Sequence, residues 1–197
     1  GGTFVSLNKL GASKGVVSLT GFGGVENGTI TLNVTKVLSL NLTVSSINLG
    51  VGSPNSGVTT FSCDSTDGTA VNWTPSSGCT TGGEHITVKN SGSVVANVTI
   101  NNVKTAAAFI CGFDTNTCNA AGVTQSYQYK RFASGNCTDS DNSFHDFDAG
   151  SHTICNRLGG SKSFDVSAKV IAPSDFDGAS SDTVTFTATE SGTSEAP

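Results

Sequence analysis

The chain alternates apolar and polar residues with a period of two in several separate stretches. In Ile30–Val34 every second residue is aliphatic, and the residues between them are Thr or Asn. The same alternation runs through Leu38–Val44 and Ala96–Ile100. Because successive side chains of a β-strand point to opposite faces, this pattern predicts strands with one face packed inward and the other facing water.

Similar patterns predict further strands along the rest of the chain. Phe164–Val170 and Val184–Ala188 alternate in the same way, and we expect them to form a hairpin-like pair. Ile86–Lys89 is expected to be a strand that a turn at Asn90–Gly92 connects to the strand around 94–101. Shorter candidate strands lie at 58–62, 70–74, 106–113 and 124–132. Residues 133–162 are rich in Ser, Asn, Asp and Gly, and are expected to be a long connection between strands.

The overall pattern indicates the fold class. No segment of ten or more residues shows the 3.6-residue periodicity of an amphipathic helix, whereas Thr and Val, which favour strands, are common. We therefore expect an all-β protein, an immunoglobulin-like or jelly-roll-like β-sandwich of nine or more strands with an extended N-terminal strand. The expected division is an N-terminal strand and flexible tether over residues 1–24, followed by a single sandwich domain over residues 25–197.

The N-terminal segment combines an apolar strand with a flexible tether. Thr3–Leu10 is rich in apolar residues, a Gly- and Ser-containing joint follows at 11–15, and 16–20 can form a second short strand. A tethered apolar strand can fold back into its own sheet. It can also complete the sheet of a neighbouring molecule, and either 3–10 or 16–20 could do so.

Composition and charge narrow the functional classes. Charged residues make up 13% of the chain, about half the usual share, and 27 Ser with 26 Thr supply much of the polar surface instead. The net charge is −5 and the ten Lys and Arg are scattered, so nucleic-acid binding is not expected. No apolar run approaches the ~20 residues of a membrane-spanning helix. The first residue is Gly rather than Met, and we expect a secreted, extracellular protein whose signal peptide has been removed.

Six cysteines in a chain of this composition predict disulfides and an oxidising compartment. Fifteen pairings are possible. The preferred pairing joins neighbours in the sequence: Cys63–Cys79, Cys111–Cys118 and Cys137–Cys155. No CxxC pair occurs and only three His are present, so neither a structural zinc site nor another metal or cofactor is expected.

The N-glycosylation pattern Asn-x-Ser/Thr occurs six times. The candidate sites are Asn27, Asn33, Asn41, Asn72, Asn97 and Asn136. In three of the expected strands the Asn and its Thr share the polar face, where a glycan would leave the core undisturbed. We expect at least two of these sites to be modified, the alternative being that Asn and Thr only fill a solvated strand face.

Several of these features together resemble a known class of surface protein. Leu38–Gly50 with Ile86–Ile100 resembles the first strands of secreted immunoglobulin-like modules, and Phe164–Val170 with Asp182–Thr189 resembles their closing hairpin. With its cysteines, glycosylation patterns and tethered N-terminal strand, the chain resembles subunits of archaeal surface filaments, the threads and bundling pili, and of related bacterial biofilm fibres.

The resemblance implies a function and a partner. In those filaments the N-terminal strand of one subunit fills a groove in the next, so the chain's partner would be a second copy of itself in a head-to-tail homopolymer. The donor strand that the resemblance implies consists of Thr3, Phe4, Val5, Leu7 and Leu10. The filament would serve adhesion or biofilm cohesion.

The sequence contains few signatures of catalytic or metal-binding sites. The three His, at 85, 145 and 152, lie outside any nucleophile signature, and the four Glu are far apart, so we do not expect an enzyme. Asp139–Asp148 alternates Asp and Asn as calcium sites do, but it lacks the Gly and Glu of an EF-hand loop, and a solvated loop is the favoured interpretation.

Two alternatives to a filament subunit remain open. One is a monomeric adhesin or carbohydrate-binding module that contacts glycans or other cells. Trp73, Tyr127 and Tyr129 could form its sugar-binding platform, although a lone Trp in a sandwich is more often part of the core. The other alternative is a coat component of a virus or a surface layer.

Overall fold

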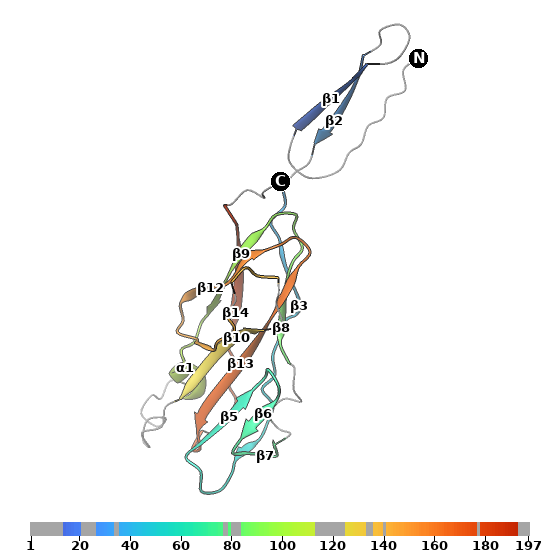
Figure 1. Ribbon diagram of the computed structural model, residues 1–197. Coiled ribbons are helices and arrows are strands. Elements are labelled where there is room, and N and C mark those ends of the chain that lie inside the picture. The colour runs from blue at the N-terminus through green and yellow to red at the C-terminus, as the bar shows by residue number, and fades with distance from the viewer. Residues whose placement is uncertain are drawn as a thin grey trace.

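The computed structural model describes residues 14–20, 27–33, 36–76, 79, 84–112, 125–132, 136–139, 141–176 and 178–192, the first two ranges by their backbone alone. Strands make up most of its regular structure, and its single described helix is one short turn. Figure 1 shows the strands of the main body as two layers running along a common long direction. The all-β sandwich expected from the alternation is confirmed.

The larger sheet is built around β13 (Ser163–Pro173). Its other members, all antiparallel to their neighbours, are β3 (Leu40–Val44), β5 (Thr60–Asp64), β6 (Thr69–Val71), β8 (Ile86–Asn90), β10 (Ser126–Phe132) and β11 (His145–Asp146). β13 pairs with β10 on one side, and with β8 and then β5 on the other. β3, β6 and β11 lie outside β8, β5 and β10, respectively.

The smaller sheet of the sandwich has three strands. They are β9 (Ala96–Asn102), in the centre, with β12 (Ser151–Leu158) and β14 (Val184–Glu190) on its two sides. A further two-stranded ribbon joins β4 (Ser53–Pro54) to β7 (Trp73–Thr74).

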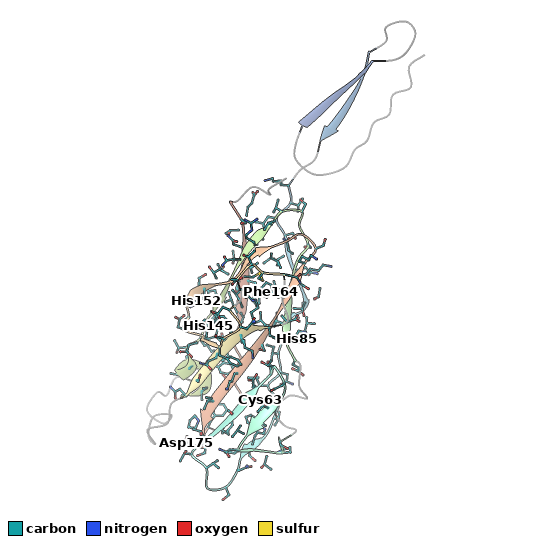
Figure 2. The ribbon with its side chains drawn as sticks, viewed as in Figure 1. Cys63, His85, His145, His152, Phe164 and Asp175 are labelled. Carbon is teal, nitrogen blue, oxygen red and sulfur yellow. A yellow bond between two sulfur atoms is a disulfide. The ribbon has the colours of Figure 1, made fainter. Side chains whose placement is uncertain are left out.

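The core lies between the two sheets. Phe164 of β13, Val88 of β8 and Ile100 of β9 are each at most 1% exposed, and alternate residues of β8, β9 and β10 point inward in the same way. Figure 2 shows Phe164 between the layers. Burying a side chain of this size contributes ~1.5–3 kcal/mol. The period-two pattern of the sequence therefore corresponds to the inward face of each strand.

The expected hairpin of 164–170 with 184–188 is wrong. Both segments are strands, but β13 belongs to the larger sheet and β14 pairs with β9 in the smaller one. β8 and β9 are likewise consecutive strands of opposite sheets. An inward apolar face is required whether the next strand stays in its sheet or crosses to the other, so alternation alone cannot decide between the two connections.

The expected strand over 106–113 is also wrong, because Ala106–Ile110 forms the helix α1. Thr105 precedes it in extended conformation, and its hydroxyl accepts a hydrogen bond from the backbone N–H of Ala108 at 3.3 Å. A threonine cap followed by three alanines favours a helical turn over a strand.

The segment 133–162, expected to be a connection, contains the long core strand β12. Its register against β9 shifts after Thr153 and again after Cys155. Ile154 and Cys155, which lie at the first register shift, are consecutive apolar residues and both buried. These bulges break the period of two and explain why the sequence pattern did not indicate a strand.

At the N-terminal end, β1 (Lys14–Thr20) pairs with β2 (Asn27–Asn33) in a two-stranded sheet. The expected division after residue 24 therefore falls between two strands that pair with each other. Thr3–Leu10, the expected donor strand, lies outside the described residues.

Candidate functional site

β3 and β14 are edge strands on the same side of the sandwich. In the part of the chain that the structure describes, β3 pairs only with β8 and β14 pairs only with β9. The two strands contact each other across the sheets. An unpaired strand edge presents free backbone N–H and C=O groups to another chain. We call Leu38–Val44 together with Val184–Glu190 the open edge.

The inner face of β3 is incompletely covered. Leu40 and Leu42 pair with Asn90 and Val88, both fully buried, so they point toward the core, yet Leu42 is 37% exposed. Leu38, just before the strand, is 43% exposed. The smaller sheet ends at β14, and no described strand lies beyond β14 to cover these side chains.

The inward side chains of β14 are incompletely covered as well. Phe186 pairs with Ile100 of β9, which is 1% exposed, whereas Phe186 is half-buried. Val184 and Ala188, on the same face as Phe186, are half-buried too. The inward side chains are thus fully buried on the central strand β9 and only half-buried on its neighbour β14. A fourth strand beside β14 would cover these residues and lie opposite Leu42.

The opposite side of the sandwich is closed by aromatic side chains. Phe147, which follows β11, is 5% exposed, and its ring lies 4.4 Å from that of Tyr127 and 4.8 Å from that of Tyr129. Phe109 of α1 stacks on Tyr127 at 4.1 Å. Burial raises the pKa of both tyrosines, and burial together with the nearby Asp148 and Asp141 carboxylates raises the pKa of Tyr129 to about 12. Leu38 and Leu42 are therefore exposed on the β3–β14 side; Val51, Val71 and Val103, which are also exposed, lie outside these two strands.

The chain enters the sandwich at the open edge. The ammonium of Lys36 lies 2.7 Å from the carboxylate of Glu190 at the end of β14. The backbone N–H of Ser93 donates to the carbonyl of Val37 at 2.8 Å, so the connection from β8 to β9 holds the entering chain. A Cβ at Gly92 would lie 2.1 Å from the same carbonyl oxygen, which explains the glycine. The segment before residue 36 thus leaves the sandwich beside the unpaired strands.

The sequon asparagines differ in their surroundings. Asn41 is exposed on β3, on the face opposite to Leu40 and Leu42. Asn72 and Asn136 are half-buried and donate from Nδ2 to backbone carbonyls, at 3.0 Å and 2.7 Å. A glycan on Asn41 would point away from the uncovered apolar face.

The other three candidate glycosylation sites are constrained in different ways. The side-chain oxygen of Asn97 accepts a hydrogen bond from the N–H of Arg157 at 3.0 Å. Asn27 and Asn33 belong to β2, whose side chains are not among the described ones. Glycosylation of all six sites stays a prediction.

Two of the three expected disulfides are present in the described residues. Cys63 is bonded to Cys79 and Cys137 to Cys155, with Cα atoms 5.5 Å and 5.4 Å apart. Cys111 is also disulfide-bonded, and Cys118, its expected partner, lies outside the described residues. Each of the two visible bonds closes a loop of fewer than twenty residues, which stabilises the fold by ~3 kcal/mol in the chain-entropy account.

The acidic segment 139–148 does not form a calcium cage. The Asp139 carboxylate accepts from Arg131 Nη1 at 2.7 Å, and Asp146 accepts from Gln128 at 2.8 Å. Arg131 is 2% exposed and also donates to the backbone carbonyl of Asp141, so it anchors the segment to β10. The carboxylates of Asp139 and Asp146 thus bind separate side chains and do not converge on one point, as the ligands of a calcium ion would. This arrangement fits the solvated-loop interpretation.

The expected sugar-binding platform is not formed, because Tyr127 and Tyr129 are 5% and 4% exposed. Trp73 packs against the core, with its ring 4.8 Å from Phe61 in an edge-to-face arrangement. A Cβ at Gly52 would overlap the indole, which shows how closely the backbone covers it. These aromatic residues are core residues, in agreement with the favoured interpretation of Trp73.

Comparison with known protein families, curated proteins and solved structures finds no match to this chain. Among the described residues, no helix is long and apolar enough to span a membrane. The disulfides fit an oxidising, extracellular compartment.

Proposed function

We propose that this chain is a secreted structural subunit of an extracellular surface filament, in which the N-terminal strand of one subunit docks at the open edge of the next. The observation that supports the proposal most is the pair of unpaired strands β3 and β14, with the inward side chains Leu42 and Phe186 incompletely covered between them. Such a filament would serve adhesion or biofilm cohesion, and its glycans would lie on the outward strand faces.

The free edge of β14 suits an incoming strand better than that of β3. The larger sheet already extends to β3, whereas the smaller sheet stops one strand short of covering the inner face of β3. β14 offers seven residues for pairing, and the donor segment Thr3–Leu10 has eight. A strand added beside β14 would therefore complete the smaller sheet along its whole length.

The energy of such a joint is sufficient for a stable fibre. Roughly six backbone hydrogen bonds would contribute ~1 kcal/mol each. Three or four buried apolar side chains would contribute ~1.5–3 kcal/mol each. This gain exceeds most estimates of the cost of association, ~4–15 kcal/mol. Because the donor and the acceptor are different surfaces, the contact is head-to-tail, and it propagates into a fibre where the rotation between neighbours does not close a ring.

Electron microscopy of negatively stained protein tests the proposal. We expect the full-length secreted chain to form long thin fibres with a regular repeat. Removal of residues 1–10, or the change Leu7→Asp, removes apolar contacts of the donor and should leave monomers. The matched control is Asn8→Asp, which adds the same charge at a polar position of the same strand and should still form fibres.

The result that would contradict the proposal is equally definite. Fibres from the chain without residues 1–10 would show that the donor lies elsewhere. Monodisperse globular particles from the full-length chain would favour the monomeric adhesin instead.

A further inference from the structure

The segment from Asp141 to His152, which includes β11 and the start of β12, contains the same local arrangement twice. In Asp141–His145 and again in Asp148–His152, an aspartate is followed four residues later by a histidine. The Asp141 carboxylate lies 2.8 Å from His145 Nε2 and accepts from the N–H of Ser143 at 2.9 Å. The Asp148 carboxylate lies 2.7 Å from His152 Nε2 and accepts from the N–H of Gly150 at 2.8 Å. The fold thus orients two imidazoles by the same means.

Each aspartate also determines which ring nitrogen is available. A carboxylate ionised at neutral pH only accepts hydrogen bonds, so Nε2 of its histidine carries the proton. The lone pair is then on Nδ1 of both His145 and His152. A histidine whose second nitrogen donates to a carboxylate is the usual form of a metal-binding histidine, because the carboxylate fixes the ring and raises its basicity.

The two imidazoles line one cavity of about 240 Å³. Their rings lie 5.7 Å and 6.3 Å from the ring of Tyr129, and Figure 2 shows both residues on the same side of the sandwich. Both side chains are partly exposed, 47% for His145 and 39% for His152, so ions in solution can reach both imidazoles.

The charges around this cavity favour a cation. Its lining includes the carboxylates of Asp139 and Asp141, and Asp148 lies behind His152. The one cationic side chain of the lining, Arg131, is 2% exposed, and its two Nη atoms are occupied by Asp139 and by backbone carbonyls. The accessible surface of the cavity is therefore imidazole, carboxylate and hydroxyl.

We propose that His145 and His152 form a two-imidazole site for a divalent transition-metal cation, with Asp141 and Asp148 as the carboxylates that position the ligands. Imidazole nitrogen suits Zn²⁺, Cu²⁺ and Ni²⁺, whereas Ca²⁺ and Mg²⁺ prefer oxygen ligands. Water would complete the coordination. The only described group of three potential ligands within 4.8 Å of one another is Cys137, Asp139 and Cys155, and two of those sulfurs are joined in a disulfide.

The site is independent of the proposed assembly. It lies beside β10 and β12, on the side of the sandwich opposite to the open edge. A filament would therefore carry one such site on every subunit without using it for polymerisation.

Equilibrium dialysis of the full-length, untagged chain against Zn²⁺ tests the proposal. We expect saturable uptake of one Zn²⁺ per chain that His145→Ala and His152→Ala each abolish. Asp141→Asn and Asp148→Asn should weaken binding by ~10-fold, because they keep an acceptor but remove the charge that orients the ring. An excess of Ca²⁺ should not displace the Zn²⁺.

The third histidine supplies the matched control. His85 lies 3.6 Å from Asp165, away from this cavity, so His85→Gln should bind Zn²⁺ like the unchanged chain. Thermal midpoints without metal identify any variant that fails to fold. The proposal is overturned if the unchanged chain takes up no Zn²⁺, if folded His145→Ala and His152→Ala variants bind it normally, or if Ca²⁺ competes for the same site.

Discussion

At the scale of single residues, Asn90 shows how a polar side chain can determine the path of the chain. It has no solvent exposure and lies at the end of β8, where the chain crosses to the other sheet. Its Nδ2 donates to the carbonyls of Val94 and Leu158 at 2.7 Å and 3.0 Å, and its Oδ1 accepts from the N–H of Gly92 at 3.0 Å. One amide thus connects the crossing, the start of β9 and the end of β12.

We predict that Asn90→Ala destabilises the fold by about 3 kcal/mol, because it removes three buried hydrogen bonds. The carbonyls of Val94 and Leu158 lose the amide, whereas the Gly92 N–H keeps a 3.3 Å bond to another backbone carbonyl. Urea denaturation of the monomeric Leu7→Asp background measures this difference. Asn41→Ala is the control. Asn41 is exposed and follows Leu40, the residue of β3 that pairs with Asn90, and we expect its loss to change stability by less than ~0.5 kcal/mol. An Asn90→Ala variant as stable as this control would show that the connection does not depend on the amide.

At the scale of elements, the open edge differs from the rest of the sandwich in how its strands end. β9 is paired on both sides and its inward residues are buried, whereas β14 and β3 are each paired on one side only among the described strands. Proteins normally protect such edges with charges, bulges or covering segments. Here a bulge follows Leu42 in β3, and the apolar side chains before it stay partly exposed.

We predict that Leu42→Lys prevents polymerisation while the subunit stays folded, because Leu42 is 37% exposed in the isolated chain and would be buried by an incoming strand. A buried unpaired ammonium is costly, whereas at a surface it is tolerated. Electron microscopy and the thermal midpoint measure the two effects. Thr43→Lys, an exposed neighbour, is the matched control and should form fibres. Fibres from Leu42→Lys would place the contact elsewhere.

The strands themselves could be predicted from the sequence, but their arrangement could not. Ile86–Lys89 and the segment around Phe164–Val170 are recognisable as strands because inward apolar and outward polar residues alternate along each of them. The sheet to which a strand belongs depends on long-range packing, which alternation does not contain. β12 was missed because its bulges place Ile154 and Cys155 on the inside in succession. α1 is hard to predict because its alanines favour a helix over only five residues, too short a stretch to show a helical period.

The functional residues show the same limit. The disulfide partners could be predicted, since Cys63–Cys79 and Cys137–Cys155 are neighbours in the sequence. The open edge could not, because Leu38 and Leu42 have the same alternation as core residues. Only the absence of a described fourth strand in the smaller sheet distinguishes them. Nothing in the sequence assigned a metal role to His145 and His152, because the cavity that both of them line is a product of the fold.

At the scale of the whole molecule, the sandwich has two different sides. One is closed by Phe147 and Phe109 stacked on Tyr127, and the other is the open edge, where the chain also enters the sandwich. We propose that the open edge accepts a strand and that the N-terminal segment of a second copy supplies it. In our account, polymerisation completes a sheet that the isolated subunit leaves one strand short.

Hydrogen exchange of the backbone amides, compared between the monomeric Leu7→Asp variant and the assembled full-length chain, tests this account most directly. We predict that those amides of Val184–Glu190 that do not bond to β9 exchange quickly in the monomer and become protected in the fibre, because a new strand pairs with them. Amides of β9, paired on both sides already, should be protected in both states. Unchanged exchange of β14 in fibres of the full-length chain would contradict the account, because the subunits would then be joined through another surface.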